Sequence, residues 1–266
     1  MASISQWLQT VGGEYRFEAE LLLAQHLKVD RAHILTHPER QLEPEQLITL
    51  NTQVARLKDD EPFAYLVGER EFWGLSMQVS PAVLVPRPET ELLVEWVCKQ
   101  THQGARVHDL GTGSGAIAVA IAHERQDLIV SASDVSDAAL TIAADNASRH
   151  EVNVALTQSD WFSDLAGSYD VIVSNPPYIA PYDPHLPALR HEPTIALVAA
   201  DEGLADIGHI ISRAPTFLVA NGWLILEHGY DQGPKVQAML QTAGYENIEA
   251  HDDLGQHHRA TSAVCP

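Results

Sequence analysis

Residues 109–115 read Asp109-Leu110-Gly111-Thr112-Gly113-Ser114-Gly115, and this stretch decides the fold. The run 106–110 has the length and apolar content of a strand, and the alanine-rich apolar run 115–123 fits a helix. Glycines are needed at such a turn because they adopt backbone dihedrals that other residues avoid and let the chain lie close to a ligand. A strand, a glycine turn and a helix in this order predict the first unit of an α/β domain.

Beyond this unit the chain continues to alternate strand and helix patterns. We expect further strands at 128–133, 152–157, 169–174 and 222–227 and near Asn247 and Ala260, with helices at 137–150, 204–212 and around 236–240. Such an alternation implies right-handed crossovers and a parallel sheet that helices cover on both faces. Ligands in these sheets bind beyond the carboxyl ends of the strands, where the strand order reverses.

The first 70 residues carry helical patterns and no chemical motif. A small helical bundle is therefore expected over residues 1–70, with one of its helices opening at Pro44, a residue suited to the first turn. The apolar stripes at helical spacing consist of Phe17, Leu21, Leu22, Ala24 and Leu27 and of Leu47, Leu50, Val54 and Leu57.

Residues 71–85 are expected to link this bundle to the larger domain as a β-hairpin. Short apolar runs at 72–79 and 82–85 look like two strands joined near Ser80-Pro81. The helical run 91–98 follows, with its cap supplied near Thr90. The larger domain would then occupy residues 86–266.

The composition limits the classes of function. The formal net charge is −20, from 36 acidic against 16 basic residues. This charge repels phosphate backbones and anionic membrane surfaces, so it argues against duplex DNA as the main partner and fits a basic macromolecule better. Two cysteines, Cys98 and Cys265, do not suggest a disulfide framework or a metal site. No apolar run approaches the roughly 20 residues that span a bilayer, and no targeting segment is evident, so we expect a cytosolic protein.

Asp134 ends the strand that follows the glycine turn, 19 residues after Gly115. A carboxylate there can accept hydrogen bonds from both hydroxyls of a ribose, which predicts a nucleoside ligand. The glycine turn also satisfies the looser dinucleotide pattern, so it leaves open which nucleoside is bound. A sulfonium cofactor would carry a positive sulfur, and Asp109 and Glu89 could serve it. Asp109 could equally make a hydrogen bond that stabilises the loop.

The stretch Ser159-Asp160-Trp161-Phe162 follows the third strand. A polar side chain there can accept a hydrogen bond from an adenine amino group while the aromatic ring lies on the base. A surface turn with a core tryptophan would look the same in isolation. In combination with the glycine turn and Asp134, the adenine interpretation is favoured.

Asn175-Pro176-Pro177-Tyr178 emerges from the end of the buried-strand run 171–174. Two prolines remove two backbone donors and fix φ, which makes the loop stiff, and Asn175 is restricted because it precedes a proline. A nitrogen presented to this loop finds acceptors, namely the Asn175 side-chain oxygen and the Pro176 carbonyl. These match the two N–H bonds of a primary amide or an aromatic amine. Hydrogen bonds to both protons would hold the nitrogen in line with a methyl donor and stabilise the charge that develops on it. Tyr178 is expected to pack on the planar group.

With these motifs the chain resembles the HemK/PrmC family, protein-(glutamine-N5) methyltransferases that act on peptide chain release factors. The resemblance covers nearly the whole chain from Glu61 onward and, more loosely, the helical front. Besides the motifs above, it rests on Gly68-Glu69-Arg70-Glu71-Phe72-Trp73, Pro86-Arg87-Pro88-Glu89-Thr90, Glu192-Pro193, Ala199-Ala200-Asp201 with Gly203-Leu204, and Glu227-His228-Gly229.

The resemblance implies a class I Rossmann-like, seven-stranded methyltransferase domain behind an N-terminal helical bundle that helps to dock the release factor. It implies S-adenosyl-L-methionine as the cofactor, no metal, and as cofactor-binding residues Gly111, Thr112, Gly113, Ser114, Gly115, Asp134, Trp161 and Asn175. Asn175, Pro176, Pro177 and Tyr178 would hold the substrate glutamine of a Gly-Gly-Gln motif, with Asn175, Pro176 and Tyr178 as catalytic residues. We further expect a monomer that binds neither DNA nor membranes. His108 stands where the family usually has an aliphatic residue, and we expect it only to polarise the strand edge.

Three other functions are compatible with these motifs. A glutamine methyltransferase of a ribosomal protein would share every motif and differ only in its docking surface. An adenine-N6 DNA methyltransferase uses the same type of loop on a flipped base, but its duplex must be held by basic contacts that a chain of net charge −20 does not obviously supply. A non-catalytic protein that binds an adenosyl ligand would not need a loop of paired acceptors.

Overall fold

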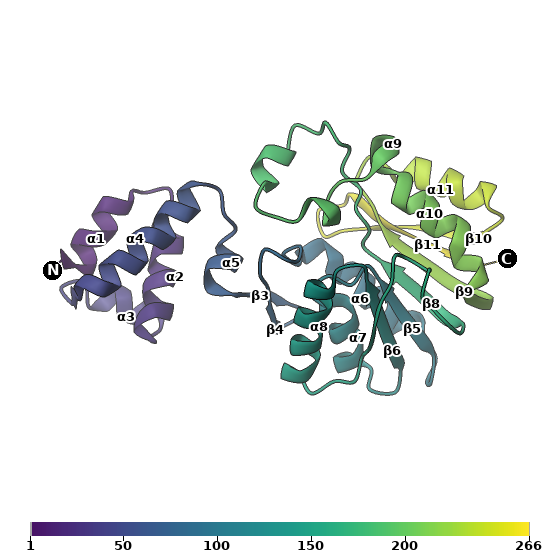
Figure 1. The fold of residues 1–266 in the computed structure, drawn as a ribbon, viewed down its shortest axis with the longest axis horizontal. Coiled ribbons are helices and arrows are strands. Elements are labelled where there is room, and N and C mark those ends of the chain that lie inside the picture. Colours follow the sequence, from purple (N-terminus) through teal and green to yellow (C-terminus); the bar gives the residue numbers. More distant parts are fainter. Residues whose placement is uncertain (1, 266) are drawn as a thin grey trace. The chain divides into compact units, whose positions relative to one another are not determined.

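The computed structural model describes residues 2–265, and the chain divides into two compact units between Gly68 and Glu69. The first unit, drawn in purple and dark blue in Figure 1, is mainly helical. Its elements are β1 (Ala2–Ser3), α1 (Ile4–Val11), α2 (Arg16–Leu27), α3 (Arg31–Thr36), β2 (Gln41–Leu42), α4 (Pro44–Lys58) and α5 (Phe63–Val67).

The core of the first unit forms where the apolar stripes of its helices meet. Helix α4 begins at Pro44 as predicted and buries Leu50, Val54 and Leu57. Phe17 was predicted to belong to the stripe of α2 but is 53% exposed. Its ring instead lies under the Arg31 guanidinium, whose central carbon is 4.8 Å from the ring centre. The face of α2 that is buried carries Leu22 and Leu23, and Phe17 lies outside it.

The second unit opens with a short hairpin that lies earlier than predicted. Strands β3 (Glu69–Phe72) and β4 (Leu75–Gln78) pair antiparallel, and Trp73 and Gly74 form the turn with φ of 54° and 69°. Two consecutive positive φ values match the turn that two-residue hairpins prefer. The predicted strand at 82–85 is wrong, since these residues form no strand. Three of them, Ala82, Val83 and Leu84, instead line a cavity.

The remaining elements alternate as the sequence predicts, and their central sheet has seven strands. The helices are α6 (Glu91–Gln100), α7 (Ala116–Glu124), α8 (Asp137–Arg149), α9 (Ala200–Gly203), α10 (Ala205–Arg213) and α11 (Gly233–Thr242), with short 3-10 turns η1 (Pro88–Thr90), η2 (Leu186–Leu189), η3 (Thr194–Ala196) and η4 (Ala214–Thr216). The strands are β5 (Arg106–Leu110), β6 (Ile129–Asp134), β7 (Ala155–Gln158), β8 (Tyr169–Ser174), β9 (Leu218–Glu227), β10 (Glu246–Asp252) and β11 (His258–Val264).

The strand order is β10-β11-β9-β8-β5-β6-β7. Strands β9, β8, β5, β6 and β7 run parallel, and β11 runs antiparallel to both β9 and β10. The chain starts in the middle at β5, moves outward to β7, and returns to the other side of β5 as β8. The order therefore reverses between β5 and β8, which is where such sheets bind ligands. This sheet confirms the predicted Rossmann-like α/β fold.

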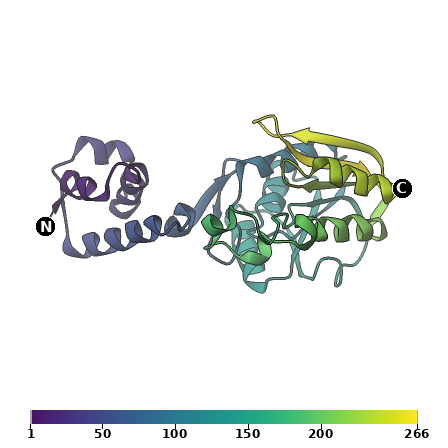
Figure 2. The same ribbon diagram turned by 90° about the horizontal axis from the view of Figure 1, so that it is seen from above.

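Helices cover both faces of the sheet. On one face α6 and α7 bury Leu93, Trp96, Ile117 and Ile121 against the strands. On the other face α10 and α11, which lie side by side in Figures 1 and 2, bury Ile207, Ile210, Val236 and Leu240. No helix occurs between β7 and β8, where residues 159–168 form turns. Within residues 2–265 no helix is long and apolar enough to cross a membrane.

Candidate functional site

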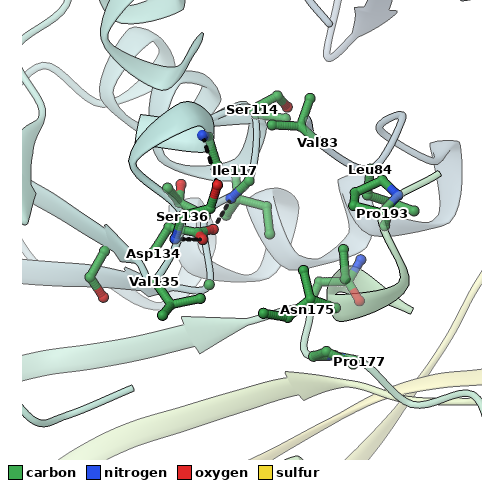
Figure 3. A pocket seen from close by; sticks show the side chains of 18 of the residues that line it. Val83, Leu84, Ser114, Ile117, Asp134, Val135, Ser136, Asn175, Pro177 and Pro193 are labelled. Carbon is green, nitrogen blue, oxygen red and sulfur yellow. Dashed lines mark hydrogen bonds between the residues drawn. The ribbon is translucent and has the colours of Figure 1, made fainter. Parts of the chain in front are cut away.

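A cavity of about 410 Å³ opens at the carboxyl ends of β5, β6 and β8, within the usual size range of small-molecule sites. The glycine turn, Asp134, Trp161 and Asn175 all line it. In Figure 3, Asp134 and Ser136 lie on one side of this cavity, and Asn175 and Pro177 lie on the other. Four predicted features that are far apart in the sequence therefore meet at one place.

The glycine turn is held open by backbone hydrogen bonds to the neighbouring strand. Gly111 N and Thr112 N both donate to the Ser133 carbonyl at 2.9 Å. Gly111 and Gly113 have φ of 75° and 55°, which other residues rarely adopt. A Cβ on Gly111 would lie 3.4 Å from the Trp161 ring. The glycine at position 111 thus keeps open a space beside the Trp161 ring, and a side chain at this position would make that space smaller.

Gly115 was predicted to bind the cofactor, but it does not line the cavity. A Cβ at this position would lie 3.0 Å from the Ala143 Cβ and 3.1 Å from its Cα. Gly115 therefore lets α7 approach α8 closely, so its role in the structure is one of helix packing. Thr112, Gly113 and Ser114 do line the cavity.

Asp134 ends β6 with both carboxylate oxygens fixed by backbone amides. Its Oδ2 accepts from Gly113 N at 2.8 Å and its Oδ1 accepts from Ser136 N at 2.9 Å, as the dashed lines in Figure 3 show. Each carboxylate oxygen can accept more than one hydrogen bond. The side chain is therefore oriented in advance and retains acceptor capacity for a pair of hydroxyls.

Asp109 has the loop-stabilising role that the sequence left open. It is fully buried, and its Oδ2 accepts from Thr112 Oγ1 at 2.5 Å and from Ala118 N at 3.2 Å. Burial raises the pKa of the Asp109 carboxyl to about 7. Asp109 does not line the cavity, and Glu89, the other acid considered, is exposed. Neither carboxylate lines the cavity.

Trp161 forms part of the cavity wall together with Ser159, Asp160 and Asp206. Trp161 has a φ of 50°, an unusual conformation for a large residue. Ser159 is buried and stabilises this turn, since its Oγ donates to the Trp161 carbonyl at 2.8 Å and accepts from Asp164 N at 3.0 Å. Phe162 does not line the cavity and stacks on Phe217, with ring centres 5.0 Å apart.

Asn175 follows β8 and is held close to the glycine turn. The preceding Ser174 is fully buried, and its Oγ donates to the Leu110 carbonyl at 2.6 Å. The Asn175 amide donates through Nδ2 to Thr90 Oγ1 at 3.1 Å. No residue in the described part of the chain donates to Asn175 Oδ1 or to the Pro176 carbonyl. Both predicted acceptors are therefore free to accept a hydrogen bond.

Pro176 and Tyr178 do not line the cavity, whereas Asn175 and Pro177 do. The Tyr178 hydroxyl donates to Glu227 Oε1 at 3.2 Å, and burial raises the pKa of Tyr178. Tyr178 is expected to pack its ring on the planar substrate group, and its hydroxyl end contacts Glu227 at the end of β9. The reason is that Glu227 is buried beneath the loop and needs a donor.

Several residues that support this site carried no local signature in the sequence. A Cβ on Gly203 would lie 2.1 Å from the Tyr178 carbonyl oxygen, and Gln232 Nε2 donates to the same oxygen at 3.0 Å. Gly203 follows Asp201 and Glu202, and all three have positive φ. Only the family motif containing Gly203 could have drawn attention to this turn.

Asn146 supports the glycine turn from α8. Its side chain is fully buried, donates to the Ser114 carbonyl at 2.8 Å and exchanges hydrogen bonds with the backbone of Gln78 at 2.6 and 3.0 Å. On the far side of the cavity, Arg87 forms an ion pair with the buried Glu192. This pair joins the segment before α6 to the one that carries Pro193, and both segments line the cavity.

His108 has a larger role than the predicted polarisation of the strand edge. It lies in the central strand β5, 1% exposed, with Nδ1 2.8 Å from Ser131 Oγ and Nε2 2.9 Å from Ser133 Oγ. Burial lowers its pKa to about 4. Because both ring nitrogens have a serine hydroxyl as partner, the buried imidazole leaves no ring nitrogen unpaired. Among residues 2–265, no cluster of three or more His, Cys, Asp or Glu could hold a metal.

Comparison with known proteins matches both units. Residues 2–68 match the model of the PrmC N-terminal domain, and residues 88–192 match that of the methyltransferase small domain. The chain is 48% identical over 256 residues to the release factor glutamine methyltransferase of Coxiella burnetii, an alignment that covers 95% of this chain and 92% of the relative.

Solved structures share the fold at low sequence identity. A methyltransferase from Pyrococcus furiosus has a TM-score of 0.57 at 19% identity, over 80% of this chain and 98% of its own. The Thermus thermophilus 16S rRNA N2 G1207 methyltransferase, solved with AdoMet and guanosine, also has a TM-score of 0.57, at 18% identity over 74% of this chain and 50% of its own.

Proposed function

This chain belongs to the family of release factor glutamine methyltransferases, and from that premise we propose that Asn175 and Pro176 hold the substrate glutamine beside the methyl donor. The protein is an enzyme that uses S-adenosyl-L-methionine to methylate a glutamine of peptide chain release factors.

The residues around the cavity fit an adenosyl cofactor. Bound there, S-adenosyl-L-methionine supplies a methyl group activated by the positive charge on its sulfur. The fixed carboxylate of Asp134 is placed to accept hydrogen bonds from the ribose hydroxyls, since both of its oxygens are oriented by backbone amides. The Trp161 ring, which lies against Gly111, would cover the adenine. Thr112, Gly113 and Ser114 would surround the remainder of the cofactor.

The substrate nitrogen would be held by the two free acceptors of the loop. An amide NH2 offers two N–H donors, and Asn175 Oδ1 and the Pro176 carbonyl can each accept one. An amide lone pair is delocalised into its carbonyl, with a rotation barrier of about 18–20 kcal/mol in peptides. Hydrogen bonds from both N–H groups raise electron density on the nitrogen and stabilise the positive charge that forms as the N–C bond is made. The methyl–sulfur bond would break as the N–C bond forms, and the nitrogen would then release to solvent one proton, which becomes acidic only at that stage, so no strong base is required beforehand.

One observation carries this proposal. The two oxygens that the mechanism needs have no donor among residues 2–265, although the loop around them is fixed by several hydrogen bonds. A loop with a purely structural role would be expected to use acceptors of this kind internally, because buried or half-buried carbonyls are usually paired. The free acceptors are thus best explained as a substrate site.

The rest of the substrate lies outside the cavity. We propose that the reactive glutamine is that of a Gly-Gly-Gln motif, whose small neighbours would let it enter, and that residues 1–70 help to dock the release factor. The enzyme would work as a monomer in the cytosol and would not bind DNA, for which a net charge of −20 is unsuited.

The assignment is tested with Asn175→Ala and Asp134→Ala. We expect Asn175→Ala to abolish methyl transfer in single-turnover assays while the cofactor affinity falls only modestly, because Asn175 contacts the nucleophile more than the cofactor. Asp134→Ala should weaken cofactor binding most. Calorimetry gives the affinities. Loss of cofactor binding with unchanged transfer in Asn175→Ala, or equal affinities for the two variants, contradicts the assignment.

The acceptor is identified by incubating the enzyme with labelled cofactor and separate samples of release factor, ribosomal protein and DNA. Label in the release factor alone is the expected result. Label in a ribosomal protein would favour the related glutamine methyltransferase activity, and label in DNA would favour adenine methylation.

A further inference from the structure

Thr90 stands at the N-cap of α6 but does not cap it. A threonine at this position usually accepts a hydrogen bond from the first turn of its helix. Here its φ and ψ are helical, at −67° and −19°, and its side chain makes no capping hydrogen bond. Thr90 is 4% exposed, and its hydroxyl oxygen accepts instead from Asn175 Nδ2 at 3.1 Å. Residues 85 positions apart in the chain are thus joined at the catalytic loop.

This contact decides which end of the Asn175 amide faces the substrate. An asparagine side chain has a donor end and an acceptor end. With Nδ2 directed to Thr90, the acceptor Oδ1 is left for a ligand. If the amide turned by 180°, it would present its own NH2 to the NH2 of the substrate, and the two donors would repel. The orientation of Asn175 is therefore a requirement of the proposed chemistry and has to be enforced by a neighbour.

Thr90 can accept from Asn175 reliably only if its own proton is directed elsewhere. A hydroxyl has one proton to donate. Glu227, at the end of β9, is 1% exposed, and the Thr90 hydroxyl is close enough to its carboxyl to lower its pKa by hydrogen bonding, as Tyr178 also does. Burial outweighs both effects and raises the pKa to about 7. Glu227 Oε2 is buried and has no hydrogen-bond partner among residues 2–265, which leaves it as an open acceptor for the Thr90 proton.

We propose that Thr90 and Glu227 are positioning residues that orient the Asn175 amide, through a directed series in which Asn175 donates to Thr90 and Thr90 donates to Glu227. In its ionised form the Glu227 carboxylate can only accept, and this form fixes the direction of the series. Tyr178 donates to the other oxygen of Glu227 and so anchors the far end of the loop to the same group. This inference rests on the proposed role of Asn175 and adds the residues that make that role possible.

The test changes the hydrogen-bonding group of Thr90 or of Glu227 while keeping the side chain close to its original size. Thr90→Val lacks the hydroxyl, Thr90→Ser keeps it, and Glu227→Gln can donate to Thr90 and so reverse the series. Thr101→Val is the matched control, since Thr101 lies at the opposite end of α6 and its hydroxyl donates to the Val97 carbonyl. The full-length protein is assayed with a release factor for kcat, for KM, and by calorimetry for the affinity for S-adenosyl-L-methionine. Thermal unfolding reports whether each variant is folded.

We expect Thr90→Val and Glu227→Gln to lower kcat by about 10- to 100-fold, the range expected when a reacting group is misoriented, with cofactor affinity within about two-fold of wild type. Thr90→Ser should restore kcat to within about three-fold, and Thr101→Val should leave it unchanged. The double variant Thr90→Val/Glu227→Gln should be no slower than Thr90→Val alone, because both act on one series.

The inference is overturned if Thr90→Ser is as slow as Thr90→Val, if Glu227→Gln retains the wild-type kcat, or if the two substitutions add. Glu227→Gln leaves Thr90 in place, so its kcat tests the directed series even if Thr90→Val does not fold. A failure of the proposed role of Asn175 would be recognised by a different result. In that case Asn175→Ala would transfer methyl groups at the wild-type rate.

Discussion

Gly203→Ala offers the sharpest test of how the catalytic loop is held. Gly203 lies against the Tyr178 carbonyl, and an added Cβ would be 2.1 Å from that oxygen and 2.7 Å from its carbon. Both contacts are with backbone, which cannot swing aside as a flexible side chain would. Gly104→Ala is a matched control, because Gly104 has nearly the same φ, +79° against +84°, and no atom within 4 Å of the added Cβ.

Comparing the two variants separates the cost of the left-handed backbone from the cost of the close contact. A left-handed backbone costs an alanine roughly 1–2 kcal/mol in either variant. To restore a tolerable 3.0 Å contact, the Tyr178 carbonyl or the turn at Gly203 must shift by about 0.9 Å, since 3.0 − 2.1 = 0.9. Overpacking of this kind costs about 1–3 kcal/mol more. A misplacement of about 1 Å can lower the rate by about 100-fold when reacting groups depend on the geometry.

The assay measures urea unfolding and methyl transfer for both variants. We expect Gly203→Ala to lose roughly 1–3 kcal/mol more stability than Gly104→Ala and to lower kcat by about 100-fold. Cofactor affinity should change little, because Tyr178 does not line the cavity. If Gly203→Ala keeps kcat within two-fold of Gly104→Ala, the close approach of Gly203 does not position the loop and the reasoning is refuted.

Three other perturbations test the supports of the site. The pKa of His108 is lowered to about 4 from 6.5 in the folded chain, so the unfolded chain binds more protons between these values and stability falls as the pH drops below about 6.5. The loss attributable to His108 should reach about 2 kcal/mol at pH 5, measured as the difference in urea unfolding from His108→Leu; a difference that does not vary with pH would contradict it. Asn146→Ala leaves three backbone groups unpaired and should cost about 3 kcal/mol in thermal unfolding, with weaker cofactor binding by calorimetry because the glycine turn loosens. Glu192→Ala removes the partner of Arg87 and should also weaken cofactor binding; an unchanged dissociation constant would show that the ion pair does not shape the cavity.

The fold was predictable where local pattern and topology agree. Strands 106–110 and 169–174 have the predicted bounds, because their apolar runs are buried in the centre of the sheet and end at polar or proline-containing turns. The hairpin before α6 was predicted too late in the chain. Its turn is formed by Trp73 and Gly74, and a tryptophan at positive φ is not a turn signal that a sequence pattern provides.

The site was predictable in part for the same reason. Gly111, Asp134 and Asn175 each follow or end a strand, and parallel strands deliver their carboxyl ends to one edge of the sheet. The sequence did not separate the residues that face the cavity from those that support it. Gly115, Pro176 and Tyr178 stand next to cavity-lining residues yet do not line the cavity themselves.

The sequence by itself determined the order of strands and helices, the glycine turn, and the stiff loop of Asn175 and two prolines, since each depends on residues adjacent in the chain. Tertiary structure alone decided what orients these groups. Thr90 meets Asn175 across 85 residues, Glu227 meets Tyr178 across 49, and Asn146 meets Gln78 across 68. A side chain's hydrogen-bonding partner depends on which segments the packed sheet and helices bring within about 3 Å, and no local pattern of residue types specifies that.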